Sequence, residues 1–305
     1  MIQFIKPGTN IDFIGKRNIA IAVSIILIVA GIISVAIKGG FNYGIDFSGG
    51  TMVQLLFKED VPIDKVRNGL VKIHMGDSII QHYGGGKEII IRTKASSEVL
   101  EDIGEKIKNI LEPEFSKGGF EIRKVEMVGP KAGKDLRMKA ILSLFYAMLL
   151  MLVYVSWRFE FSFGLGAIIA LIHDVLVTAG VISFTNTEFD LAIVAALLTI
   201  VGYSINDTIV VYDRIRENLK EKRRETYASI LNISINETLS RTILTSFTVF
   251  MVSIILYLFG GEVIHGFSLA MVVGVIAGTY SSIYIASPIV LFWESSPGRR
   301  LTTKK

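Results

Sequence analysis

Three charged side chains, Asp174, Asp207 and Arg241, interrupt long apolar runs of this sequence, and they are its strongest candidates for chemistry. Asp174 follows His173 in one run, Asp207 follows Asn206 in the next, and Arg241 lies near the start of a third. A charge inside a bilayer is costly, so such residues face the interior of a helix bundle and pair with one another. The Asp207 carboxylate and the Arg241 guanidinium lie at similar depth, so each could offset the desolvation of the other.

Two polar sites follow from these residues. Asp207, Arg241 and Asn206 predict a proton relay, a common role of intramembrane carboxylates, and a buried pair that only fixes helix register is the alternative. Helical spacing extends a polar edge from Asp207 to the end of its run, through Ser204, Asp207, Val211 and Arg214 on one stripe and Asn206, Ile209, Asp213 and Glu217 on the next. A candidate secondary polar site consists of Asp174 and His173 together with Asp213 and Arg214. The alternative is that the His173 imidazole only forms a hydrogen bond with the neighbouring Asp174 carboxylate.

Composition defines the elements that must position these groups. The 305 residues are 51% hydrophobic and 20% charged, with a net charge of +4 and no cysteine. Soluble domains carry about 25% charged residues, and the apolar residues here gather in runs that approach the roughly 20 needed to cross a bilayer. These features exclude a soluble enzyme, a disordered chain, a disulfide scaffold and cysteine-based chemistry. They predict a polytopic α-helical membrane protein with six transmembrane helices.

The spans and their orientation follow from hydropathy and from the positions of Lys and Arg. We expect transmembrane helices at 18–37, 140–157, 163–184, 189–212, 239–259 and 267–293. Basic residues favour the cytoplasm, which places there the N-terminus 1–17, an amphipathic connection 213–238 and the tail 294–305, and leaves 38–139 outside. Ser34-Val35-Ala36 is similar to a signal-peptidase site, so cleavage after the first run is an alternative, but that run exceeds the about 7–15 residues of a signal core.

The segment 38–139 is expected to fold as an α+β ferredoxin-like extracytoplasmic domain. Its strands are predicted at 51–57, 78–83, 88–93 and 120–128, and its helices at 62–74 and 96–111. The order strand, helix, strand, strand, helix, strand is that of a split βαβ unit. Its acidic and basic residues are nearly balanced, so nucleic acid is not an expected partner.

Small residues recur at every fourth position of the last span, at Gly266, Ala270, Gly274, Gly278, Ser282 and Ala286. Such a ridge lets a neighbouring helix approach closely. We interpret it as a packing surface.

Two motifs resemble the SecF branch of the SecD/SecF family, in the resistance–nodulation–division superfamily. The first lies just outside the first span and includes Gly44, Asp46, Phe47, Gly49 and Gly50. The second extends from Val201 to Asn218, and Ser240-Arg241-Thr242 at the start of the fifth span adds to it. The resemblance covers nearly the whole chain.

The resemblance implies a non-enzymatic subunit without cofactor or metal, in a bacterial or archaeal cytoplasmic membrane. Such a subunit pairs with SecD into a pseudo-symmetric unit of twelve spans, associates with the SecYEG channel and uses the proton-motive force to promote translocation of preproteins. Membrane lipids would surround it. The proton-handling aspartate of the family matches Asp207, and its arginine on the next span matches Arg241.

A switch at this pair is the mechanism we expect. Asp207 would be ionised beside Arg241 and neutral when withdrawn into apolar surroundings, and the movement of the spans would tilt the outer domain. Two other classes remain open. One is an exporter of lipids or small molecules of the resistance–nodulation–division type, and the other is an intramembrane aspartyl protease using Asp174 and Asp207, although the glycine-flanked aspartate of such proteases is absent.

Overall fold

The computed structural model describes residues 10–83, 86–93, 100–115 and 118–294, which form two compact units. The helix bundle comprises Met1–Asn42, Leu142–Thr187 and Ala192–Lys305. The ferredoxin-like domain comprises Tyr43–Ile141 and, in addition, Glu188–Leu191. A short segment between two spans therefore belongs to the ferredoxin-like domain.

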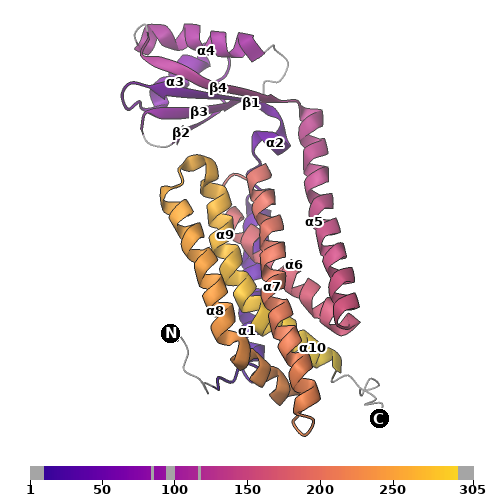
Figure 1. Cartoon of the computed structure of the whole chain (residues 1–305). Coiled ribbons are helices and arrows are strands. Elements are labelled where there is room, and N and C mark those ends of the chain that lie inside the picture. Colours follow the sequence, from indigo (N-terminus) through magenta and orange to yellow (C-terminus); the bar gives the residue numbers. More distant parts are fainter. Residues whose placement is uncertain (1–9, 84–85, 94–99, 116–117, 295–305) are drawn as a thin grey trace. The chain divides into compact units, whose positions relative to one another are not determined.

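Six helices of the described chain are long and apolar enough to cross a membrane, as predicted. They are α1 (Arg17–Ile37), α5 (Pro130–Arg158), α6 (Phe161–Phe184), α7 (Leu191–Glu221), α8 (Tyr227–Phe259), and the last span, made of α9 (Glu262–Ser281), a π-helical turn η1 (Ser282–Ala286) and α10 (Ser287–Glu294). Figure 1 labels all of these α-helices. Helix α5 begins at Pro130 rather than at the predicted 140, and proline is favoured in the first turn of a helix.

The connection predicted at 213–238 is not a separate helix. Its first part continues α7 to Glu221, and its last part opens α8 at Tyr227. The Thr226 hydroxyl accepts a hydrogen bond from the backbone N–H of Ser229 at 3.2 Å, and this cap starts α8. Both helices therefore extend well beyond the predicted apolar runs.

The six helices divide into three buried and three exposed ones. Half or more of the apolar stretch of α6, α7 and the last span is buried, against fewer than a fifth in α1, α5 and α8. The exposed surface of α1 and α5 is apolar, with side chains such as Ile26, Ile33, Phe145 and Leu150. Such surfaces suit lipid or another apolar helix.

Small residues set the closest helix approaches. The predicted ridge of the last span packs against α7: a Cβ added at Gly278 would lie 2.9 Å from the Cβ of Ser204, and the Tyr212 hydroxyl donates to the Ala286 carbonyl at 3.4 Å. Helix α1 meets α6 where a Cβ added at Gly31 would lie 2.8 Å from the Cα of Gly180.

The π-helical turn has a local cause in the sequence. Pro288 has no N–H to donate to the preceding turn, and its ring crowds the carbonyl four residues earlier. The helix widens at Ser282–Ala286, and the Ser287 hydroxyl donates to the Ser282 carbonyl at 3.1 Å. The widened turn places Ser282 against α7, where its hydroxyl lies 3.0 Å from that of Thr208.

The first described residues form a strap across α8. Asn236 donates to and accepts from the backbone of Ile11, both at 2.8 Å, and Asn232 accepts from the N–H of Phe13 at 2.9 Å. The side chains of Phe13 and Ile14 are buried in the bundle core. The strap, residues 10–14, is thus fixed by both polar and apolar contacts.

The ferredoxin-like domain has the predicted topology. It contains α2 (Ile45–Ser48), β1 (Gly50–Phe57), α3 (Ile63–Val71), β2 (Ile79–Tyr83), β3 (Glu88–Thr93), α4 (Leu100–Phe115) and β4 (Phe120–Val128). The strands form an antiparallel sheet in the order β2-β3-β1-β4. Helices α3 and α4 cover one face of it (Figure 1), and residues 96–99 of the second predicted helix lie outside the described residues.

Alternation along β1 explains which face is covered. Val53, Leu55 and Phe57 are buried, whereas the residues between them are half-buried. They meet Leu70 of α3 and Ile107 of α4 in one apolar core. This period of two is what the sequence pattern predicted.

Candidate functional site

Asp207 lies on α7 in a cage of hydroxyl groups. Only 2% of the residue is exposed. Its Oδ2 accepts a hydrogen bond from Ser246 at 3.0 Å and its Oδ1 accepts one from Thr245 at 3.3 Å, both on α8. Thr279 of α9 donates to Ser246 at 2.7 Å, so three helices converge on this carboxylate.

Arg241 does not form an ion pair with Asp207. It lies one turn before Thr245 on α8, its side chain is exposed, and within the described chain no salt bridge joins it to Asp207. The Thr245 hydroxyl lies between the two residues, because its single hydrogen has both the Asp207 Oδ1 at 3.3 Å and the Arg241 carbonyl at 3.0 Å as possible acceptors. In this structure the two residues that we expected to pair are therefore not joined by a salt bridge.

Asp174 on α6 occupies a second polar cluster. The residue is completely buried, and it accepts hydrogen bonds from Ser204 of α7 at 2.6 Å and from Ser281 of α9 at 2.9 Å. The Nδ1 of His173 lies 3.0 Å from its other oxygen, and the Nε2 lies 3.1 Å from the hydroxyl of Ser24 on α1. One carboxylate and one imidazole thus connect four helices.

The two carboxylates have separate hydrogen-bond partners. Asp207 is held by Thr245 and Ser246, whereas Asp174 is held by Ser204 and Ser281. An aspartyl protease needs two carboxylates that share one proton, and this arrangement does not provide such a dyad.

The other predicted site residues lie in different places. Asn206 is exposed on α7 and does not join the cage around Asp207. Asp213 lies 3.5 Å from Arg158 at the end of α5. The four residues of the predicted secondary site are therefore not brought together, because only His173 and Asp174 are in contact.

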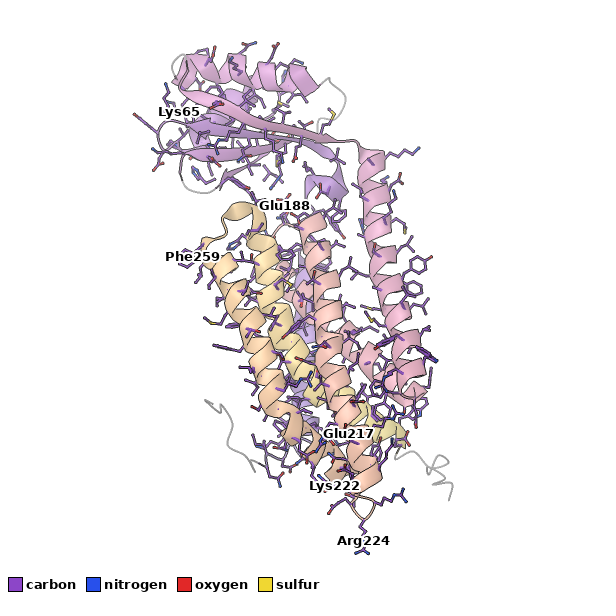
Figure 2. All side chains as sticks on the ribbon, viewed as in Figure 1. Lys65, Glu188, Glu217, Lys222, Arg224 and Phe259 are labelled. Carbon is purple, nitrogen blue, oxygen red and sulfur yellow. The ribbon has the colours of Figure 1, made fainter. Side chains whose placement is uncertain are left out.

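Arg214 belongs to an ionic hub that joins α7 and α8. Its side chain donates to Glu237 and to Glu217, each at 2.7 Å. Glu237 also accepts from Asn218 at 2.7 Å and from Lys222 at 2.9 Å. Figure 2 labels Glu217 and Lys222 at this end of the bundle, with Arg224 in the turn between the helices.

The glycine-rich motif has conformational reasons for its glycines. Gly49 and Gly50 have φ angles of 71° and 127°, a region that favours glycine, where α2 turns into β1. Phe47 is buried in this turn. The Asp46 carboxylate accepts a hydrogen bond from the backbone N–H of Leu191 at 3.1 Å.

The hydroxyl side chains of the cage were not predicted from the sequence. A stripe of Ser234, Thr238, Thr242 and Ser246 follows the helical repeat of α8, and all four are buried. That spacing could have identified the face of α8 that meets Asp207. Within the described residues, no group of three or more His, Asp or Glu side chains could hold a metal ion.

The fold and these clusters define a multi-pass membrane protein whose buried carboxylates connect several spans, with a ferredoxin-like domain inserted between its first two spans. Family models match two parts of it: the C-terminal SecD/SecF protein-export membrane protein model at residues 107–296, and the SecD/SecF GG motif at residues 33–61. The chain belongs to the SecF branch of the SecD/SecF family, as an accessory subunit of the Sec translocase.

Relatives of similar length support this assignment. The SecF protein translocase subunit of Desulfurispirillum indicum is 45% identical over 93% of this chain and 92% of its own, and that of Calditerrivibrio nitroreducens is 45% identical over 96% and 97%. SecDF from Thermus thermophilus, described as a translocon-associated membrane protein, superposes with a TM-score of 0.85 at 36% identity. The match covers 95% of this chain but 39% of that longer one.

Proposed function

We propose that this subunit couples proton movement to protein translocation through a switch at Asp207 and Arg241. The observation that supports it is a buried carboxylate in a hydroxyl cage, with Arg241 one helical turn before Thr245 of that cage and no salt bridge between Arg241 and Asp207. Hydroxyl groups donate to a carboxylate and accept from a carboxylic acid, so the cage accommodates both protonation states. Approach of Arg241 would accompany release of the proton, and separation would accompany its uptake.

Asp174 and His173 are the second site in this proposal. Ser204 donates to Asp174, and Thr208, one turn further along α7, pairs with Ser282 of the π-helical turn. A change at either carboxylate would therefore be felt by the packing of α7 against the last span. Asp213 and Arg214 would hold the ends of these helices rather than carry protons.

SecD is the proposed partner that covers the exposed polar positions of the bundle. Arg241 and Thr248 are exposed on α8, and Asn206 is exposed on α7. Polar and charged side chains do not suit lipid, so a second half of similar size is a better neighbour for this surface. The SecYEG channel and the translocating preprotein complete the assembly we propose, with lipids against α1 and α5.

The proposed membrane is the bacterial or archaeal cytoplasmic membrane, with both termini inside. The basic turn between α7 and α8 supports this orientation, because Lys and Arg concentrate in cytoplasmic connections. Moving one charge through 100 mV provides about 2.3 kcal/mol, which suffices to bias a two-state element.

Asp207→Asn tests the switch. In membrane vesicles that contain SecD and SecYEG, we expect the variant to assemble normally. Its ionophore-sensitive export, the part of export that an ionophore abolishes in the wild type, should be at least about tenfold lower. Asp213→Asn is the matched control, since it removes an accessible carboxylate from the same helix, and its export should remain sensitive to the ionophore. Ionophore-sensitive export by Asp207→Asn at the wild-type level would refute the assignment.

A further inference from the structure

The segment Glu188–Leu191, which precedes α7, is folded into the ferredoxin-like domain. The N–H of Gly44 donates to the Phe189 carbonyl at 3.0 Å, and Tyr43 and Phe189 form a parallel β-bridge. The Phe189 ring packs against Tyr43 and Phe47, with centroid distances of 6.2 and 6.1 Å. Backbone and aromatic contacts therefore hold this segment to the glycine-rich motif.

Two charged contacts complete the attachment. Asp46 accepts from the N–H of Leu191, the first residue of α7. The first N–H groups of a helix have no partner within it, and a negative charge there is favourable. Glu188, labelled in Figure 2, forms an ion pair with Arg92 of β3, and both side chains are more than three-quarters buried.

Glycine at position 44 makes this close fit feasible. A Cβ added to Gly44 would lie 2.8 Å from Oε1 of Glu188 and 3.3 Å from the Cβ of Asp190. A larger residue would therefore displace the Glu188 carboxylate and crowd Asp190. The same motif also touches the start of α5, where a Cβ added at Gly133 would lie 3.0 Å from the N of Gly49.

Helix α7 is continuous from this attachment to the proposed switch. It extends without interruption from Leu191 to Glu221. Asp207 lies about 24 Å along the axis from Leu191, at about 1.5 Å per residue. A single uninterrupted helix therefore connects Asp207 to the first turn of α7.

We propose that Asp46 is a positioning residue that fixes the first turn of α7 to the ferredoxin-like domain, so that this helix transmits movement at Asp207 into that domain. The inference rests on the proposed function of Asp207. Asp46 thereby has a mechanical role, which the close packing of Gly44 and Phe189 beside it makes feasible.

The test compares Asp46→Ala with Asp46→Asn in the complete assembly with SecD and SecYEG. Asparagine caps a helix about as well as aspartate, whereas alanine does not. We expect Asp46→Ala to speed hydrogen exchange of the first-turn amides of α7 by about tenfold and to lower ionophore-sensitive export by at least fivefold. Asp46→Asn should retain most of both properties. Asp64→Ala, which removes an exposed carboxylate from the first turn of α3, is the control and should change neither.

A double variant separates transmission from general damage. If Asp46 acts through Asp207, then Asp46→Ala combined with Asp207→Asn exports no less than Asp207→Asn alone. If the export losses of the two single variants add up in the double variant, the inference is overturned. It is also overturned if Asp46→Ala exports at the wild-type level while Asp207→Asn is inactive. Wild-type behaviour of Asp207→Asn would instead overturn the proposed function and this inference with it.

A second variant keeps the test decisive if Asp46→Ala does not accumulate. Arg92→Gln breaks the ion pair with Glu188 and leaves Asp46 in place. We expect it to lower ionophore-sensitive export as well, and unchanged export would overturn the inference.

Discussion

Glu237 should determine the stability of the hairpin formed by α7 and α8. It is the acceptor shared by Arg214, Asn218 and Lys222, at 2.7 to 2.9 Å. Glu237→Ala removes all three contacts without inserting a new polar group. Asn218 is fully buried, so its side-chain amide keeps only its bond to Ser234.

The expected cost is about 2 kcal/mol. Each ion pair is partly exposed, and such pairs contribute only about 0.2–1 kcal/mol. The hydrogen bond from the Asn218 amide contributes about 1 kcal/mol. Glu237→Gln keeps an acceptor for Asn218 and should lose roughly half of this. Glu217→Ala is the control, because Glu217 is 53% exposed and is bonded to Arg214, and it should cost less than about 0.5 kcal/mol.

Hydrogen exchange of the amides of Lys222 and Ile230 measures this opening, because both bond within the hairpin end, to Asn218 and Thr226. A loss of about 2 kcal/mol corresponds to roughly 30-fold faster exchange, at about 1.4 kcal/mol per tenfold. Unchanged exchange in Glu237→Ala, or an equal effect in Glu217→Ala, would show that the hub does not hold the helices together.

Two further predictions concern packing and pH. Gly278→Ala should lower the free energy of unfolding by about 1–3 kcal/mol, because its Cβ would meet that of Ser204. Gly202→Ala is the control and should be neutral or stabilising, because nothing lies within 4 Å of the added Cβ. Equal melting temperatures of the two variants in detergent would contradict this prediction. Burial raises the pKa of Glu188, although Arg92 opposes the shift. The Glu188 carboxyl group therefore makes its full contribution to stability below the ordinary glutamate pKa, and this contribution is lost as the pH rises through the raised pKa. Melting temperatures measured between pH 4 and 8 should show this loss in the wild type and not in Glu188→Gln.

The sheet and the spans could be predicted because burial imposes a period on the sequence. The strands Glu88–Thr93 and Phe120–Val128 have the predicted bounds. Helix ends were less accessible: α3 was expected to reach His74, but it ends at Val71, and His74 has a φ of 57°, which no α-helix accommodates. Local turn geometry of this kind leaves little trace in hydropathy.

For the candidate site, the sequence did not predict which way the side chains face. The sequence led us to expect Asp207 and Arg241 at similar depth, but in the structure Arg241 is exposed while the next residue, Thr242, is buried. The hydroxyl groups that reach Asp207 belong to Thr245 and Ser246, about one turn further along α8 than Arg241. Hydroxyl groups in a span also bond to their own helix, as Thr245 does, so their presence alone does not identify a site.

The strap across α8 has a consequence for biogenesis. Asn236 lies 225 positions after Ile11 in the chain, so this contact cannot form until the fifth span has been synthesised. Until then, the side chains of Phe13 and Ile14 cannot pack against α8. Docking of the strap on α8 is therefore a late event in assembly. A bulky fusion placed directly before the strap would be tolerated during membrane insertion but would interfere with this final packing step.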